Sequence, residues 1–228
     1  MNIKSNIKPF LPKHIIDLYR FIHCHIPLSV LILTGKIIRL VWTPRFPENE
    51  EGKLFLHLGC GNINKPGFIN IDAVPKSHIH YVRAIDNLTI FENNTISLIY
   101  SSHCLEHISH RELPNVLNEW YRVLKKEGIL RLAVPDFDTL LKIYKENDNE
   151  VNSIIRFLMG GQSNKFDYHY SVFTYSSLSS LLHETGFREV RRWQAGASEL
   201  TTFQDWSAGE IDVKGKKYPV SLNIEAVK

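Results

Sequence analysis

From residue 53 onward the chain alternates short apolar runs with segments of amphipathic, helical spacing. The apolar runs predict seven β-strands, at residues 54–58, 68–71, 81–85, 96–100, 129–134, 189–194 and 221–227. Helices are predicted between them, including one from Ser109 to a stop at Gly128, one after Asp136 and one after Thr174. Buried runs separated by amphipathic helices are typical of a mainly parallel sheet covered on both faces. We therefore predict a doubly wound α/β fold over residues 53–228.

Residues 1–50 follow a different pattern. Apolar residues recur at helical spacing between residues 15 and 22, and a second apolar stretch runs from Pro27 to Trp42. The apolar run from Ile26 to Leu33 is far shorter than the roughly 20 residues of a membrane-spanning helix. A signal peptide also fits poorly, because no small-residue cleavage site follows. We expect a helical extension, joined by a linker at 44–52, that covers the main domain or its pocket. Contact with a membrane surface is the alternative.

Charge and cysteine content narrow the class of protein. The net charge is only +3, and the basic residues are scattered apart from Arg191-Arg192 and the run at 214–217. This is not the basic stripe of a nucleic-acid-binding protein. Three irregularly placed cysteines are too few for a secreted disulfide framework. We expect a cytoplasmic protein, with the membrane periphery as the alternative location, and no nucleic-acid partner.

A histidine-rich stretch, SSHCLEHISH at residues 101–110, raises the question of a metal site. His103 and His107 stand four residues apart, as ligands on one helix face would. Residues Ser109-His110-Arg111-Glu112, however, have the form of a capping box, so the helix is expected to start after His107. Both histidines then lie in the turn after the strand at 96–100, and no distant Cys or His pair completes a ligand set. We predict no bound metal.

Two glycines and a carboxylate indicate a nucleoside site. Gly59 and Gly61 follow the first strand, where glycine lets the backbone turn sharply and approach a ligand. Asp72 ends the second strand, where a carboxylate can accept hydrogen bonds from two ribose hydroxyls. A dinucleotide is disfavoured, because Asp72 follows Gly61 by 11 residues instead of roughly 20 and the third glycine is missing. The first helix must be reduced to about one turn.

Four stretches together resemble the class I S-adenosylmethionine-dependent methyltransferases: LHLGCG (56–61), FINIDA (68–73), DNLTIFENNTISLIYSSHCLEHI (86–108) and LKKEGILRLAVPD (124–136). Within that family the chain is most similar to a bacterial branch with a short first helix, often associated with cell-surface saccharide synthesis. The resemblance covers residues 53–228, with the last helix and closing strands at 177–193 and 221–228. It implies a Rossmann-like fold and S-adenosyl-L-methionine as the cofactor.

The resemblance also implies roles for particular residues. The glycine loop would pass under the methionine part of the cofactor, Asp72 would hold the ribose, and the residues after the third strand would meet the adenine amino group. Ser102 and His103 would border the sulfonium. The residues implied to contact the cofactor are Gly59, Cys60, Gly61, Asp72, Asp86, Asn87, Ser102 and His103. Many relatives carry an acidic residue two positions before the first glycine, where this chain has His57.

Several residues near these motifs also have ordinary structural interpretations. Cys60 suits a small space-filling role, and Asp86 could begin a turn. Asp136 is placed to cap the helix that follows it. Trp120 is expected in the core, and Glu106 could accept a hydrogen bond from a nearby backbone amide.

Methyl transfer chiefly requires that the acceptor be aligned with the sulfonium, and a hydroxyl acceptor also benefits from a base. His103, His107 and His169 are the candidate bases, because imidazole titrates near neutral pH. His169 lies in Phe166–Ser171, a stretch expected either to fold over the carboxyl ends of the strands as the acceptor wall or to pack as an ordinary loop. Its aromatic residues with polar tips suit a small-molecule or saccharide-like acceptor.

We therefore predict an S-adenosylmethionine-dependent methyltransferase that acts on a small-molecule or saccharide-like acceptor, with cell-surface polysaccharide synthesis as its setting. Two alternatives remain at this point. A nucleotide-dependent oxidoreductase on a related fold is disfavoured by the short interval between Gly61 and Asp72. A catalytically inactive nucleoside-binding module would be distinguished by a lack of turnover.

Overall fold

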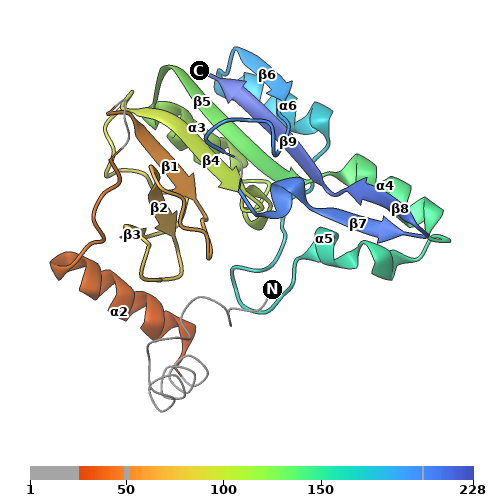
Figure 1. The fold of residues 1–228 in the computed structure, drawn as a ribbon, viewed down its shortest axis with the longest axis horizontal. Helices are drawn as coiled ribbons and strands as arrows, with labels where there is room; N and C mark the ends of the chain where they lie inside the picture. The colour runs from red at the N-terminus through yellow and green to blue at the C-terminus, as the bar shows by residue number, and fades with distance from the viewer. Residues whose placement is uncertain (1–25, 49–51, 202) are drawn as a thin grey trace.

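The computed structural model describes residues 26–48, 52–201 and 203–228 (Figure 1). Seven strands form one sheet in the order β3-β2-β1-β4-β5-β9-β6. The first five pair in parallel, whereas β9 runs antiparallel to both β5 and β6. The predicted mainly parallel, seven-stranded α/β fold is confirmed.

The bounds of the elements agree closely with most of the predicted runs. The strands of the sheet are β1 (Leu54–Leu58), β2 (Ile69–Asp72), β3 (Tyr81–Val82), β4 (Ile96–Ser102), β5 (Leu124–Pro135), β6 (Glu189–Arg192) and β9 (Ser221–Val227). The helices are α2 (Leu28–Val41), α3 (Leu113–Val123), α4 (Phe137–Glu146), α5 (Ile155–Met159) and α6 (Tyr175–Thr185), with 3-10 turns η1 (Leu105–His107), η2 (Val151–Ser153) and η3 (Trp206–Ala208).

Successive side chains of the strands point to two different apolar clusters, as strand geometry requires. On one face, β1, β4, β5 and β9 pack against α3 and α6. The Trp120 ring is fully buried there and its Nε1 donates to Ile85 O at 2.7 Å, which confirms its predicted place in the core. The opposite face carries an aromatic cluster that includes Tyr100, Trp193 and Phe203. The loop after β6 carries Trp193 and Phe203 and so supplies part of the packing on this face.

Helix α3 departs from the predicted boundaries. It begins at Leu113, and the predicted capping box is wrong, because the N-cap Glu112 makes no side-chain capping bond. Ser109 O instead accepts from Glu112 N at 2.8 Å, which closes a turn before the helix. The predicted stop at Gly128 is also wrong, since β5 starts directly after Val123. Lys228 Nζ caps this end of α3 by donating to Tyr121 O at 2.6 Å.

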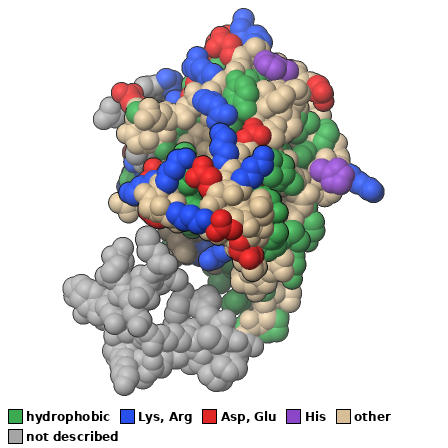
Figure 2. All heavy atoms as spheres, turned by 90° about the vertical axis from the view of Figure 1, so that its right-hand side faces the viewer, with side chains coloured by type: hydrophobic (Ala, Val, Ile, Leu, Met, Phe, Trp, Pro, Cys, Tyr) green, Lys and Arg blue, Asp and Glu red, His purple; other side chains and the backbone are tan. Residues whose placement is uncertain are grey.

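A β-hairpin of strands β7 (Glu210–Val213) and β8 (Lys216–Pro219) was not predicted. Lys214 and Gly215 form its turn with φ of 52° and 82°, the positive values of a two-residue type I′ turn. The lysines of this region pair with acidic residues, as in Lys214–Asp148 at 2.7 Å. Figure 2 shows Lys and Arg side chains mixed with Asp and Glu on the face that bears the hairpin. The lysines at 214–217 therefore do not form a purely positive surface patch.

Helix α2 lies beside β3, at the edge of the sheet (Figure 1). Gly35 permits close packing, because a Cβ there would stand 2.4 Å from Pro75 Cβ. Arg39 Nε donates to Ile79 O at 2.7 Å, while Leu40 is largely exposed. The predicted helix within residues 27–42 is confirmed, and the helical spacing at 15–22 lies outside the described residues. No helix in the described part of the chain has the length and apolar character to cross a membrane.

Candidate cofactor and acceptor site

The loop after β1 holds both of its glycines in left-handed backbone conformations. Gly59 has φ 63° and Gly61 has φ 55°. A Cβ at Gly59 would stand 2.2 Å from Cys104 Sγ, so only glycine allows this loop to pack on the segment after β4. A Cβ at Gly61 would meet nothing within 4 Å, which leaves open space above the loop. Residues 59–68 contain no helix, so the predicted shortening of the first helix is confirmed.

Asp72 joins the end of β2 to the glycine loop. Its Oδ2 accepts from Gly61 N at 2.8 Å, and its Oδ1 accepts from Val74 N at 2.8 Å. Each carboxylate oxygen keeps a further lone pair for a ribose hydroxyl, and the side chain is partly exposed. The carboxylate and the open space at Gly61 together fit the nucleoside and methionine parts of S-adenosyl-L-methionine.

The other residues implied to contact the cofactor lie in the glycine loop, in the turn after β3 and at the end of β4. The Cys60 side chain is buried with Ile79 and Val82, and burial raises the pKa of its thiol far above the usual range. Its space-filling role is confirmed. Asp86 and Asn87 lie in an exposed turn after β3, where Asn87 Oδ1 accepts from Thr89 Oγ1 at 2.7 Å. The structure thus shows the turn that the sequence indicated, in which both residues are exposed and Asn87 Oδ1 also accepts from Arg83.

His57 does not reproduce the acidic residue of its relatives. Its side chain is 1% exposed and lies in the aromatic cluster, with its ring centroid 4.9 Å from that of Phe203 and 5.3 Å from that of Tyr100. Burial lowers the pKa of His57 to about 3, although the nearby Asp205 acts in the opposite direction. A neutral imidazole cannot replace a carboxylate in holding the ammonium group of the cofactor.

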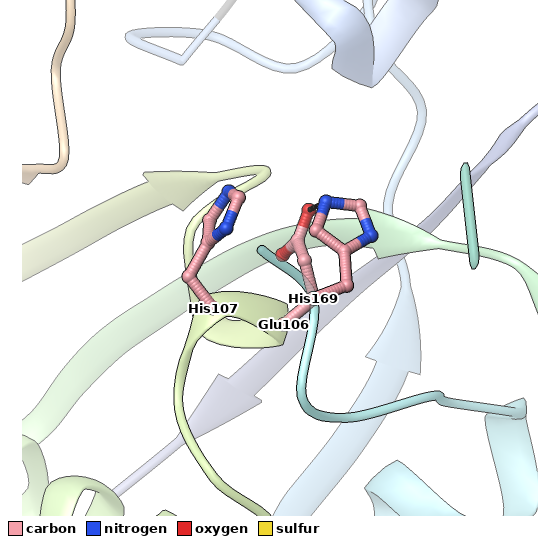
Figure 3. Close-up of side chains that lie close together, drawn as sticks. All are labelled: Glu106, His107 and His169. Carbon is pink, nitrogen blue, oxygen red and sulfur yellow. Dashed lines mark ion pairs between the residues drawn. The ribbon is translucent and has the colours of Figure 1, made fainter. Parts of the chain in front are cut away.

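The three predicted base candidates gather around one buried carboxylate at the carboxyl end of β4. Glu106 in η1 is fully buried. Its Oε1 lies 3.3 Å from His103 Nδ1 and 3.9 Å from His169 Nε2. The ring centroid of His107 lies 4.7 Å from that of His169. Figure 3 shows Glu106, His107 and His169 side by side.

The loop at 160–173 reaches this cluster because backbone hydrogen bonds fasten it to η1. Tyr170 N and Ser171 N both donate to Glu106 O, at 2.8 and 3.2 Å. Ser171 Oγ donates to Ile108 O at 2.6 Å. These contacts bring His169 beside residues that lie far from it in the sequence, which no spacing rule could indicate.

The carboxylate of Glu106 itself makes no aligned hydrogen bond within the described residues. The side chain turns toward the histidines, and its own backbone N–H is the backbone amide that contributes to the lowered pKa of this carboxyl group. Burial by itself raises the pKa of Glu106, but the contacts with His103 and His107 outweigh burial and lower it. Burial lowers the pKa of His169. At neutral pH the cluster thus combines an ionised carboxylate with a neutral His169.

Two residues of the site were missed by the sequence analysis. Ser221 begins β9, and its Oγ lies 2.7 Å from His103 Nε2. Trp206 in η3 is half exposed, and its ring centroid lies 6.3 Å from that of His103. Ser221 pairs with Pro135 at the carboxyl end of β5, so only the sheet register reveals its place. Asp136, beside it, accepts from Asp138 N at 3.2 Å and caps α4 as predicted.

The sheet order, the glycine loop after β1 and the carboxylate at the end of β2 are those of a Rossmann-like fold, whose ligands bind at the carboxyl ends of the strands. A family model described as a methyltransferase domain matches residues 41–191, more than half of the chain. The chain therefore belongs to this methyltransferase family. It is an enzyme that uses S-adenosyl-L-methionine, as the resemblance implied, and the oxidoreductase alternative is set aside.

Solved structures of low sequence identity are similar to this chain. A SAM-dependent methyltransferase from Archaeoglobus fulgidus is 16% identical with a TM-score of 0.49, and the match covers 92% of this chain and 99% of that one. Phosphoethanolamine N-methyltransferase 2 from Haemonchus contortus is 16% identical with a TM-score of 0.40, over 66% of this chain and 37% of that one. No curated protein matches the chain.

Replacing Asp72 tests the cofactor site. Asp72→Ala should weaken binding of S-adenosylhomocysteine by about 1 to 3 kcal/mol, because ribose hydroxyls and Gly61 N lose their acceptor. Isothermal titration calorimetry measures the change, with Asp138→Ala in α4 as the matched control. Unchanged affinity in a folded Asp72→Ala protein would refute the assignment.

Replacing His57 tests its buried neutral state. The pKa of His57 is lowered in the folded protein, so its contribution to the free energy of unfolding is fully present above its pKa in the unfolded chain, near 6.5. That contribution is lost as the pH drops toward 3. Between pH 7 and pH 5 this one group should cost the wild type about 2 kcal/mol of unfolding free energy. Denaturant unfolding should show that loss reduced in His57→Leu but not in His110→Leu. An equal loss in wild type and His57→Leu would contradict the account.

Proposed function

We propose that this enzyme transfers the methyl group to a hydroxyl of a small, saccharide-like acceptor, with His103 as the base. The observation that carries the proposal is the position of His103. It follows the last residue of β4, with Nδ1 3.3 Å from the buried Glu106 carboxylate and Nε2 2.7 Å from Ser221 Oγ. A carboxylate behind one ring nitrogen and a hydroxyl at the other is the arrangement that a general base requires.

The cofactor site at the same edge of the sheet supports this role. S-adenosyl-L-methionine, when bound, supplies a methyl group that its sulfonium already activates. We assign Asp72 to the ribose, Asp86 and Asn87 to adenine, and the loop of Gly59, Cys60 and Gly61 to the methionine part. Ser102 and His103 would then border the sulfonium. What remains for the protein is to align the acceptor and to remove its proton.

Proton removal follows from the two contacts of His103. The Ser221 hydroxyl can donate to Trp206 O at 2.5 Å or turn to His103 Nε2 at 2.7 Å. When Nδ1–H points to Glu106, the lone pair of Nε2 faces this hydroxyl position. An acceptor hydroxyl near that position donates its proton to Nε2 as its oxygen attacks the methyl carbon. Glu106 keeps the ring in this orientation and stabilises the imidazolium that forms. His107 and His169, the other candidate bases, lie farther along the cluster.

Exposed aromatic rings near His103 support a saccharide-like acceptor. Trp206 is 50% exposed, and its ring contacts that of Phe157 with centroids 5.9 Å apart. Tyr168 and Tyr170 are stacked with centroids 6.4 Å apart on the loop fastened to η1. Rings of this kind offer apolar faces to a sugar, while their polar tips hydrogen-bond to its hydroxyls. The loop at 166–171 is thus proposed as the acceptor wall.

The biological setting stays a prediction. We predict that the enzyme lies in the cytoplasm and takes part in cell-surface polysaccharide synthesis. We also predict that the chain divides into an extension at 1–50 and a domain at 53–228. Contact of residues 1–50 with a membrane surface is supported by the exposed Leu33 and Leu40 of α2 and by Trp42, the C-cap residue that follows the helix.

Removing the base should slow the reaction without loosening the cofactor. His103→Ala is expected to lower kcat by about 100-fold or more, the range for a lost general base. Affinity for S-adenosylhomocysteine should change by no more than a few fold. Steady-state kinetics with a responsive saccharide acceptor, beside calorimetry, give both values. A folded His103→Ala enzyme with wild-type kcat would exclude His103 as the base.

Trp206→Ala tests the acceptor platform. Loss of a stacking face should raise the KM for a saccharide acceptor by about fivefold, corresponding to the roughly 1 kcal/mol of an aromatic contact. The kcat should fall much less, because the ring makes no contact with the reacting proton. Trp42→Ala, at the exposed C-cap residue that follows α2, serves as the matched control. If both variants keep the wild-type KM, the acceptor does not lie on Trp206.

A further inference from the structure

We propose that Glu106, His107 and His169 form a binding site for a divalent first-row transition cation. One carboxylate oxygen and one ring nitrogen of each histidine lie within 4.8 Å of one another (Figure 3). Ligand atoms around a tetrahedral cation of zinc size stand about 3.4 Å apart, as follows from metal–ligand bonds of roughly 2.1 Å. Small side-chain rotations therefore suffice to close the set.

The Glu106 carboxylate is the first sign that a cation belongs here. It is 0% exposed, and neither oxygen makes an aligned hydrogen bond within residues 26–48, 52–201 and 203–228. Buried charges in proteins are normally paired or coordinate a metal, because an isolated charge in a low dielectric is costly. His103 Nδ1 lies 3.3 Å from Oε1, which leaves Oε2 without a hydrogen-bond partner among the described residues. A cation beside Glu106 would supply the missing charge.

The histidines are held in the way that metal ligands are held. His169 Nδ1 donates to Phe157 O at 2.8 Å, which turns Nε2 toward Glu106. His107 Nδ1 lies 3.0 Å from Tyr168 O. A histidine that ligates a metal usually donates its other ring N–H to a backbone carbonyl or a carboxylate, which fixes the tautomer and the ring orientation. Both rings thus have a lone pair available without any rearrangement of the backbone.

The donor set selects the class of cation. Two imidazoles and one carboxylate suit Zn²⁺, Mn²⁺ or Fe²⁺, whereas Mg²⁺ and Ca²⁺ prefer oxygen ligands alone. Three protein ligands leave coordination positions open, as in catalytic metal sites. The sequence predicted no metal, because His103 and His107 were expected in a turn and no distant Cys or His pair was seen to complete a ligand set. The third ligand, His169, reaches the site through the loop contacts with η1.

The role of the cation rests on the proposed function. The cation would lie on the side of His103 whose Nδ1 faces Glu106, whereas the proposed acceptor position is at Nε2 on the opposite side of the ring. The role of the cation would be to hold the loop that carries His169, and with it the proposed acceptor wall at 166–171, against η1.

Calorimetric titration of full-length, chelator-treated protein with Zn²⁺ alone tests the site without any acceptor. Wild type should bind one equivalent, with a Kd in the micromolar range or tighter. Glu106→Gln and His169→Ala should each weaken Zn²⁺ binding at least tenfold, and Mg²⁺ should bind far more weakly than Zn²⁺. His110→Ala is the matched control from the same histidine-rich stretch and should bind like the wild type. His169→Asn replaces His169→Ala if the latter does not fold.

Two results would overturn the inference. One is a wild type that binds no Zn²⁺, and the other is wild-type affinity in both Glu106→Gln and His169→Ala, which would place the ion elsewhere. Binding of S-adenosylhomocysteine and the effect of His103→Ala on kcat are measured on the same preparations. If S-adenosylhomocysteine binds and His103→Ala lowers kcat, while the wild type binds no Zn²⁺, the metal site is excluded and the proposed methyl transfer stands.

Discussion

The burial of one carboxylate shapes the acceptor side of this enzyme. Glu106 is fully enclosed, and removing an ionised carboxyl group from water costs several kcal/mol unless other charges or dipoles offset it. Three histidines surround the carboxylate and offset part of this cost, and His103 Nδ1 and His169 Nε2 approach Glu106 Oε1 to 3.3 and 3.9 Å. The loop that carries His169 is fastened to the backbone of Glu106 itself. One residue thus positions both a base and a loop.

The parallel sheet brings this cluster to the cofactor loop, because the carboxyl ends of β1, β2 and β4 meet at one edge. The link is a direct contact: Gly59 has no Cβ, and the space is occupied by Cys104 Sγ. Cys104 immediately precedes η1, so the glycine loop and the Glu106 cluster pack as one unit. A larger residue at position 59 would disturb the cofactor side and the acceptor side together.

Local patterns predicted most of the fold, and long-range contacts account for what was missed. Apolar runs located the strands of the sheet, because this pattern depends on neighbouring residues. The spacing of Gly59, Gly61 and Asp72 likewise indicated the glycine loop and the carboxylate that accepts from it. The capping box failed because Ser109 closes a turn instead of capping α3. The β7–β8 hairpin was hidden in a stretch that the sequence analysis treated only as a basic run. His169, Trp206 and Ser221 join the site through tertiary contacts that spacing does not encode.

The central claim is that methyl transfer takes place between the glycine loop and the Glu106 cluster. A crystal structure of the full-length protein with S-adenosylhomocysteine and a saccharide acceptor tests this most directly. The account predicts the ribose hydroxyls on Asp72, the sulfur beside Ser102 and His103, and an acceptor hydroxyl within hydrogen-bond reach of His103 Nε2, at about 3 Å. A cofactor whose sulfur points away from His103, with the acceptor bound at another edge of the sheet, would contradict it.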